Sequence, residues 1–143
     1  MSITSANAVF TLSIAGLYGS ALPLQGFIAD DLFDFGQVSN KEIILGADGI
    51  MSAGWVPSTV TQNIAFLPDS LSIAVFEAWH QAEQAIRSVY YADGNIVLDN
   101  GSVFTLTRGV LNGYSPAPDA KKILQPRKFT ITWQSITPSA QLL

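Results

Sequence analysis

One histidine and carboxylate pair and two isolated serines come closest to the residue types of a catalytic site. Glu83 follows His80 by three residues in a stretch with helical spacing, so both side chains could lie on one helix face. Zinc usually takes three or four protein ligands, and this pair supplies two. Ser52 and Ser102 would need His80 as their base, and neither stands in the G-x-S-x-G turn of hydrolases. We therefore expect a surface or half-buried His80 and no enzymatic activity.

A group of acidic residues early in the chain is the next candidate. Asp30, Asp31 and Asp34 could form a carboxylate pair for glycoside hydrolysis or a calcium site, but the ligand spacing of an EF-hand is missing. A solvated acidic loop is the simpler interpretation. The glycines of residues 16–26 lack the spacing and the lysine of a phosphate-binding loop, and the sequence has no cysteine. We expect no metal and no cofactor.

The composition indicates a subunit that is covered by other subunits. Charged residues make up 13% of the 143 residues and hydrophobic residues 48%, with a mean hydropathy of +0.31. Soluble domains carry about 25% charged residues. The sequence contains no apolar run of the roughly 18 residues that a membrane span needs, and its start does not resemble a secretory signal. Neutral polar residues could also cover the surface of a monomer, but we expect an oligomer. We also expect synthesis in the cytosol.

The two signs of charge are segregated along the chain. The net charge is −4, three aspartates precede the first basic residue, Lys41, and four of the seven basic residues cluster late, at Lys121, Lys122, Arg127 and Lys128. The segments could meet within a subunit or between neighbours, or form two solvated loops. The acidic excess argues against tight binding of nucleic acid, whose affinity comes mainly from neutralised phosphates.

Local patterns predict a mainly β (α+β) fold. Strand patterns cover residues 8–15, 23–29, 60–67, 95–98, 102–111 and 127–138, and a hairpin joins residues 42–46 to 50–55 through Asp48 and Gly49. One helix is expected over residues 70–88, begun by Asp69 or Ser70, with an apolar face of Leu71, Val75, Ala78, Ala82, Ala85, Ile86 and Val89. Six to eight strands and one helix favour an antiparallel β-sandwich or partly closed barrel with one flanking helix, formed by residues 1–143 as one domain.

Three segments together resemble the tail tube proteins of contractile-tailed bacteriophages: "KEIILGADGIMSAGW", "VTQNIAFLPDSLSIAVFEAW" and "RKFTITWQSI". The shared pattern is a turn at residues 45–49, then Met51 and Ser52, a strand, a serine-rich helix start and a long helix. It spans residues 8–137, and the N-terminal third departs most. Tubes of type VI secretion systems look related in fold and form a near alternative.

The resemblance implies hexameric rings whose sheets join into a β-barrel, stacked as a hollow tail tube inside a contractile sheath. DNA would pass through the lumen without specific binding. Sheath, tape measure and baseplate proteins would be the partners, in the virion tail and, during assembly, in the host cytoplasm. A carbohydrate-binding or capsid-associated β-sandwich is the alternative, and it would show an exposed aromatic platform around Tyr90, Tyr91 or Trp55.

The resemblance also assigns roles to three sets of residues. Candidates for the lumen wall are Asp30, Asp31, Asp34, Glu42 and Asp99. Candidates for ring stacking are Gly46, Ala47, Asp48, Gly49, Met51 and Trp55, on a hairpin that either projects to the next ring or closes the sheet of its own subunit. The intersubunit basic candidates are Lys121, Lys122, Arg127 and Lys128.

Overall fold

The computed structural model describes residues 8–27, 33–98 and 101–139 and contains nine strands and one helix within them. The elements are β1 (Val9–Ile14), β2 (Tyr18–Leu24), β3 (Phe33–Phe35), β4 (Lys41–Leu45), β5 (Met51–Trp55), β6 (Val60–Phe66), α1 (Ile73–Ile86), β7 (Ala92–Val97), β8 (Val103–Tyr114) and β9 (Arg127–Ser139). The strand expected over 23–29 begins earlier, at Tyr18, and residues 28 and 29 lie outside the described part. The remaining predicted strands are confirmed within a few residues.

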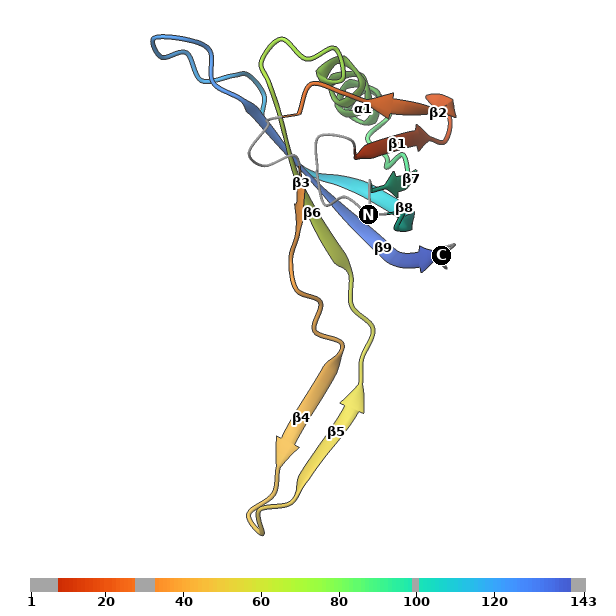
Figure 1. Ribbon diagram of the computed structural model, residues 1–143, viewed down its shortest axis with the longest axis vertical. Helices are drawn as coiled ribbons and strands as arrows, with labels where there is room; N and C mark the ends of the chain where they lie inside the picture. Colours follow the sequence, from red (N-terminus) through yellow and green to blue (C-terminus); the bar gives the residue numbers. More distant parts are fainter. Residues whose placement is uncertain (1–7, 28–32, 99–100, 140–143) are drawn as a thin grey trace.

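Seven strands form one antiparallel sheet in the order β2-β1-β7-β8-β9-β6-β3, and β4 and β5 form a second sheet by themselves. The large sheet curls so that its two ends approach each other. Phe10 of β1 packs edge-on against Phe33 of β3 at 5.7 Å between ring centroids, and an isolated bridge joins Phe27 to Phe66 of β6. The sheet is not closed by a continuous ladder. The predicted mainly β, antiparallel fold with one helix is therefore confirmed (Figure 1).

A bulge interrupts the pairing of β7 with β8. Arg108 has φ of 52°, and the pairing of β7 with β8 shifts register beside it. Inward positions of β8 change from Leu106 to Gly109 across this bulge, so the strand turns its other side to the core. Gly109 is required there, because a Cβ atom at this position would lie 2.6 Å from the ring of Trp133.

The core joins the curled sheet to the helix. The alternation predicted for residues 8–15 is confirmed, since Phe10, Leu12 and Ile14 are all buried. From the helix side, Ile73, Phe76 and Trp79 enter the core, and the ring of Phe76 stacks on Phe129 at 4.7 Å. In the described residues, no helix has the length and apolar character needed to cross a bilayer.

The predicted buried face of the helix is wrong at its two ends, whereas Val75 near its middle does pack against the core. Leu71, Ile86 and Val89 are 77%, 54% and 46% exposed. The larger rings of Phe76 and Trp79 fill the core instead, and Trp79 Nε1 donates a hydrogen bond of 3.0 Å to the Tyr90 carbonyl. Spacing alone could not decide between two faces that are both rich in apolar residues.

The start of the helix agrees with the prediction in part, since Ser70 Oγ accepts a hydrogen bond from Ser72 N at 3.2 Å. Ser72 is the N-cap residue, and its side chain accepts a hydrogen bond from Gln25 N at 2.8 Å and not from the helix. Ser70 Oγ donates to the Gln25 carbonyl. The two serines therefore tie the beginning of α1 to the segment that follows β2.

Candidate assembly interface

The β4–β5 hairpin projects from the body of the subunit as a separate arm (Figure 1). Every residue from 41 to 55 is exposed, and the hairpin forms no ladder with the seven-stranded sheet. The interpretation that this element closes the sheet of its own chain is therefore wrong, because β4 and β5 project from the large sheet and pair only with each other.

A tight turn ends the arm, as Asp48 and Gly49 predicted. Gly46 N donates to the Ile50 carbonyl at 2.8 Å, and Gly49 N donates to the Gly46 carbonyl at 3.0 Å. Gly49 takes a positive φ of 84°, which residues with a Cβ atom rarely adopt. Asp48 contributes differently from Gly49, because its Oδ1 accepts a hydrogen bond from Ile50 N at 3.1 Å. The backbone and the aspartate together fix the turn.

The arm has two faces of different chemistry, since residues opposite each other in an antiparallel pair share a face. Lys41 pairs with Trp55, Ile43 with Ala53, and Leu45 with Met51, so these six residues form one face, which we call the aliphatic face. The opposite face carries Glu42, Ile44, Ser52 and Gly54. On the aliphatic face Ile43, Leu45, Met51 and Trp55 are 61%, 70%, 61% and 68% exposed.

Such an arm is poorly stable by itself in water. A two-stranded hairpin without a third strand or a packed face is marginal. Contiguous exposed apolar surface on a folded protein marks an interaction site. The aliphatic face has the composition of an interface core, and it lacks a covering element among the described residues of its own chain.

Apolar surface continues from the arm into the body. A cavity of about 340 Å³ at the root of the arm is lined by the aromatic and aliphatic residues Phe33, Phe35, Val38, Ile96, Leu98, Phe104 and Ile136, with Gly36 and Val60. An adjoining groove of about 660 Å³ contains Trp55, Pro57 and Gln134 and shares Val38, Val60 and Ile136 with that cavity. The candidate interface therefore comprises the aliphatic face of the arm together with the groove and the cavity at its root, and the groove also contains polar residues such as Asn40 and Gln134.

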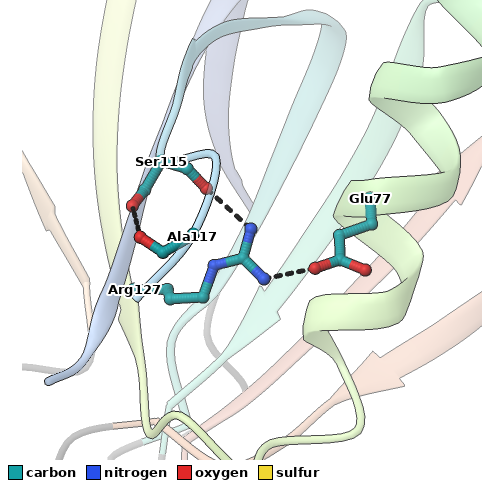
Figure 2. A network of polar contacts seen from close by, with 4 residues as sticks. All are labelled: Glu77, Ser115, Ala117 and Arg127. Carbon is teal, nitrogen blue, oxygen red and sulfur yellow. Dashed lines mark hydrogen bonds and ion pairs between the residues drawn. The ribbon is translucent and has the colours of Figure 1, made fainter. Parts of the chain in front are cut away.

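The structure separates the four basic candidates. Lys121, Lys122 and Lys128 are exposed, whereas Arg127 is 4% exposed and lies inside the subunit. Its guanidinium forms an ion pair with Glu77 of α1, and Nη2 donates to the Ser115 carbonyl at 2.6 Å (Figure 2). The late basic cluster thus supplies three exposed lysines and one internal tie, a difference that composition and spacing could not reveal.

The Arg127 tie holds the base of the loop between β8 and β9 against α1. Arg127→Lys removes the planar fork that reaches Glu77 and Ser115 at once, so we expect the loop to loosen while the fold persists. Limited trypsin digestion should then cut after Lys121 and Lys122 several-fold faster than in the wild type. Lys128→Arg, at an exposed neighbour, is the matched control and should leave that rate unchanged. Equal rates for Arg127→Lys and the wild type would contradict the tie.

The structure describes two of the five acidic lumen candidates, Asp34 and Glu42, and they lie on different elements. Asp30, Asp31 and Asp99 lie outside the described residues. Asp34 is exposed on β3 and accepts a hydrogen bond from Asn63 at 3.0 Å, while Glu42 lies on the arm. Asn63 in turn accepts a hydrogen bond from Thr130 at 3.0 Å, so a polar network of one carboxylate and two neutral side chains crosses β3, β6 and β9. Alternating polar residues are the one feature of the sequence that points to this network.

The catalytic candidates are spread over separate elements. His80 stacks on Tyr114 with ring centroids 4.0 Å apart, and Glu83 accepts a hydrogen bond from Tyr90 N at 3.1 Å. Ser52 lies on the projecting arm, far from α1, and Ser102 precedes β8 (Figure 1). Among the described residues, no three side chains of histidine, cysteine, aspartate or glutamate come together as a metal site.

The aromatic platform expected of a carbohydrate-binding module is not assembled either. Trp79 and Trp133 are fully buried, and Trp55 belongs to the aliphatic face of the arm. Tyr90 is half-buried, and the Arg108 guanidinium lies 4.2 Å from the ring centroid of Tyr91. The three platform candidates therefore lie in different surroundings, with Trp55 on the arm, Tyr90 packed against the core and Tyr91 exposed beside Arg108.

A family model described as tail fiber protein gp32 matches residues 1–137. The chain belongs to this family. Its fold also occurs in chains of two solved particles. One, from "Cryo-EM structure of the anti-feeding prophage (AFP) baseplate, 6-fold symmetrised", is 9% identical with a TM-score of 0.55, over 95% of this chain and 94% of that chain.

The second structural relative comes from "Cryo-EM Structure of an Extracellular Contractile Injection System, PVC sheath/tube terminator in extended state". It is 12% identical with a TM-score of 0.54, over 92% of this chain and 93% of that chain. No curated protein sequence matches the chain. At these identities the likeness of this gp32-family chain to both particles concerns the fold.

Proposed function

We propose that this gp32-family chain is a non-enzymatic structural component of a contractile tail, whose copies assemble into stacked hexameric rings that form a hollow tube inside the sheath. The observation that carries the proposal is the projecting arm, whose aliphatic face is left uncovered by the described residues of its own chain and would be covered by a second copy. Family membership and a fold found in chains of contractile particles support the same function.

Burial between copies explains how a chain with so little charge remains soluble in its working form. Each Å² of apolar surface removed from water contributes about 25 cal/mol, and lateral pairing of strands would cover the open edges β2 and β3. In this proposal residues 1–143 act as one domain, and the sheath, tape measure and baseplate proteins are the further partners. Assembly takes place in the host cytoplasm, before the particle is complete.

The lumen of such a tube must let DNA pass and not hold it. Acidic side chains on the wall repel phosphate weakly, whereas many basic contacts would retain a polyanion. Asp34 and Glu42 are the described candidates for this wall or its rim, and both are exposed. The neutral network of Asn63 and Thr130 beside Asp34 suits a surface along which DNA slides without specific binding.

Electron microscopy of the concentrated protein tests the proposal directly. The wild type should form six-membered rings or hollow rods. Replacing Asp48 and Gly49 with two valines removes the positive-φ residue and the side-chain acceptor of the turn, so rods should be lost while the body stays folded. Rods of unchanged length would show that the arm has no part in polymerisation.

Gly101→Val is the matched control for the turn variant. Gly101 also has a positive φ, of 88°, but it lies beside β8 in the body, and a Cβ atom there meets nothing within 4 Å. It should lower stability modestly and leave rods intact. The description of the family favours a tail fibre as the second candidate function, and solid filaments without a bore would support it.

A further inference from the structure

A second projection lies at the end of the subunit opposite the arm. Residues 115–126, the loop between β8 and β9, extend from the top of the molecule as it is drawn, whereas the β4–β5 arm extends from the bottom (Figure 1). Gln125 N donates to the Asp119 carbonyl at 2.8 Å, and Ala120 and Leu124 form an isolated bridge. The loop therefore has a defined shape at its end.

The base of the loop is also fixed. Arg127 holds the Ser115 carbonyl and Glu77, as Figure 2 shows, and Ser115 Oγ donates to the Ala117 carbonyl at 3.3 Å. A buried guanidinium that joins a helix to a loop is a costly arrangement unless both partners are held in place. The tie gives the loop a set position relative to the body, as a contact surface requires.

The ends of the two projections are chemically complementary. The loop carries two basic residues, Lys121 and Lys122, and one acidic residue, Asp119. Next to the lysines are Ile123 and Leu124, which are 74% and 51% exposed. The tip of the arm carries exposed aliphatic side chains and one charged residue, Asp48, which is the sole charge between residues 43 and 56. Each end of the subunit therefore combines exposed apolar residues with charge, which is negative at the tip of the arm and positive on the loop.

We propose that the tip of the arm of one copy docks on the 115–126 loop of a second copy. Leu45, Ile50 and Met51 pack on Ile123 and Leu124, and Asp48 faces Lys121 and Lys122. This inference rests on the proposed function and names the partner of the arm. Because the two surfaces differ and lie at opposite ends, the contact is heterologous and propagates along an axis, which joins ring to ring.

The two parts of the contact have separable effects. Apolar burial supplies most of the affinity and depends little on salt. The Asp48 and lysine pairs fix the register and make stacking salt-dependent, because the screening length falls from about 10 Å at 0.1 M to about 3 Å at 1 M. Salt dependence that disappears with the charges is therefore the signature of this contact.

Charge exchange tests the pairing in the full chain. Lys121→Glu with Lys122→Glu should raise the concentration needed for stacking about tenfold or more at low salt. The difference should shrink toward none near 1 M salt. Adding Asp48→Lys to this loop variant restores opposite charges and should recover part of the stacking, since the turn loses its side-chain acceptor but keeps Gly49 at positive φ. Sedimentation and negative-stain images measure the threshold and the rod length.

Two further variants keep the test interpretable. Asp48→Asn keeps the acceptor that the turn needs and removes only the charge, so it should weaken stacking in a salt-dependent way without disturbing the arm. Lys128→Glu reverses an exposed lysine on β9 outside the loop and should leave the threshold unchanged. An equal loss with Lys128→Glu would show a general charge effect and overturn the pairing.

The outcomes separate this inference from the function beneath it. A wild type that forms neither rings nor rods under any condition overturns the proposed function. A wild type that stacks normally, with a loop variant that stacks equally well at low salt, overturns only the docking of the arm on the loop. Loop variants whose rings lose single subunits, while the remaining rings stack normally, would also overturn the docking of the arm on the loop.

Discussion

Replacing Ile43, Leu45 and Met51 with threonine is expected to abolish self-assembly while the body of the subunit stays folded. The three side chains belong to the aliphatic face and are 61% or more exposed, so they contribute little to the isolated chain. Burying a Leu, Ile or Met side chain in an interface contributes roughly 1.5–3 kcal/mol. Losing all three weakens association by about three orders of magnitude or more. Threonine keeps the β propensity of the arm.

The opposite face of the same hairpin provides the control. Ile44→Thr changes one exposed aliphatic residue on the face that also carries Glu42 and Ser52. It should have a much smaller effect on association if the aliphatic face is the interface. Analytical ultracentrifugation across a concentration series measures both variants, and thermal unfolding checks the body. A triple variant that assembles like the wild type would remove the arm from the interface.

Trp133→Ala is expected to lower the free energy of unfolding by about 3–5 kcal/mol, the largest effect that we expect on stability from one substitution. Trp133 is fully buried on β9, and its ring lies against Gly109 and Gly94. Its Nε1 donates to Gln62 Oε1 at 2.9 Å, so alanine leaves both a cavity and a buried glutamine without its donor. Urea unfolding followed by circular dichroism measures the loss, in the assembly-deficient background.

Trp55→Ala makes the same substitution at an exposed position and is the comparison for Trp133→Ala. Trp55 is 68% exposed on the arm, so its removal should change the stability of the monomer by less than about 0.5 kcal/mol. It should instead weaken assembly, since aromatic residues near the centre of interfaces contribute strongly to binding. A large loss of monomer stability from Trp55→Ala would mean that the arm packs on its own subunit in solution.

The arm shows how far local sequence information reaches. Asp48 and Gly49 between two β-prone segments predicted the hairpin and its turn, because the backbone conformation of a short turn depends on a few adjacent residues. The alternation of residues 8–15 likewise predicted β1 and its buried side, since the period of a strand matches the pattern directly. Both predictions depend only on neighbours in the chain, and both are confirmed.

The helix and the basic cluster show where local information ends. Apolar residues lie on two sides of α1, and the side that packs was chosen by the fit of Phe76 and Trp79 beside Phe129 and Tyr90. Arg127 looked like its lysine neighbours in the sequence. Its burial follows from the position of Glu77, 50 residues away, and of the Ser115 carbonyl.

The sequence by itself determined that this chain is a charge-poor, mainly β subunit with one helix and a hairpin turn at residues 46–49. Tertiary structure alone decided that the hairpin leaves the sheet as an arm, that the 115–126 loop projects at the other end, and that Arg127 ties that loop down. Local conformation depends on adjacent residues, whereas the exposure and direction of an element depend on which distant segments fill the core. The surfaces available for assembly are those that remain after this packing.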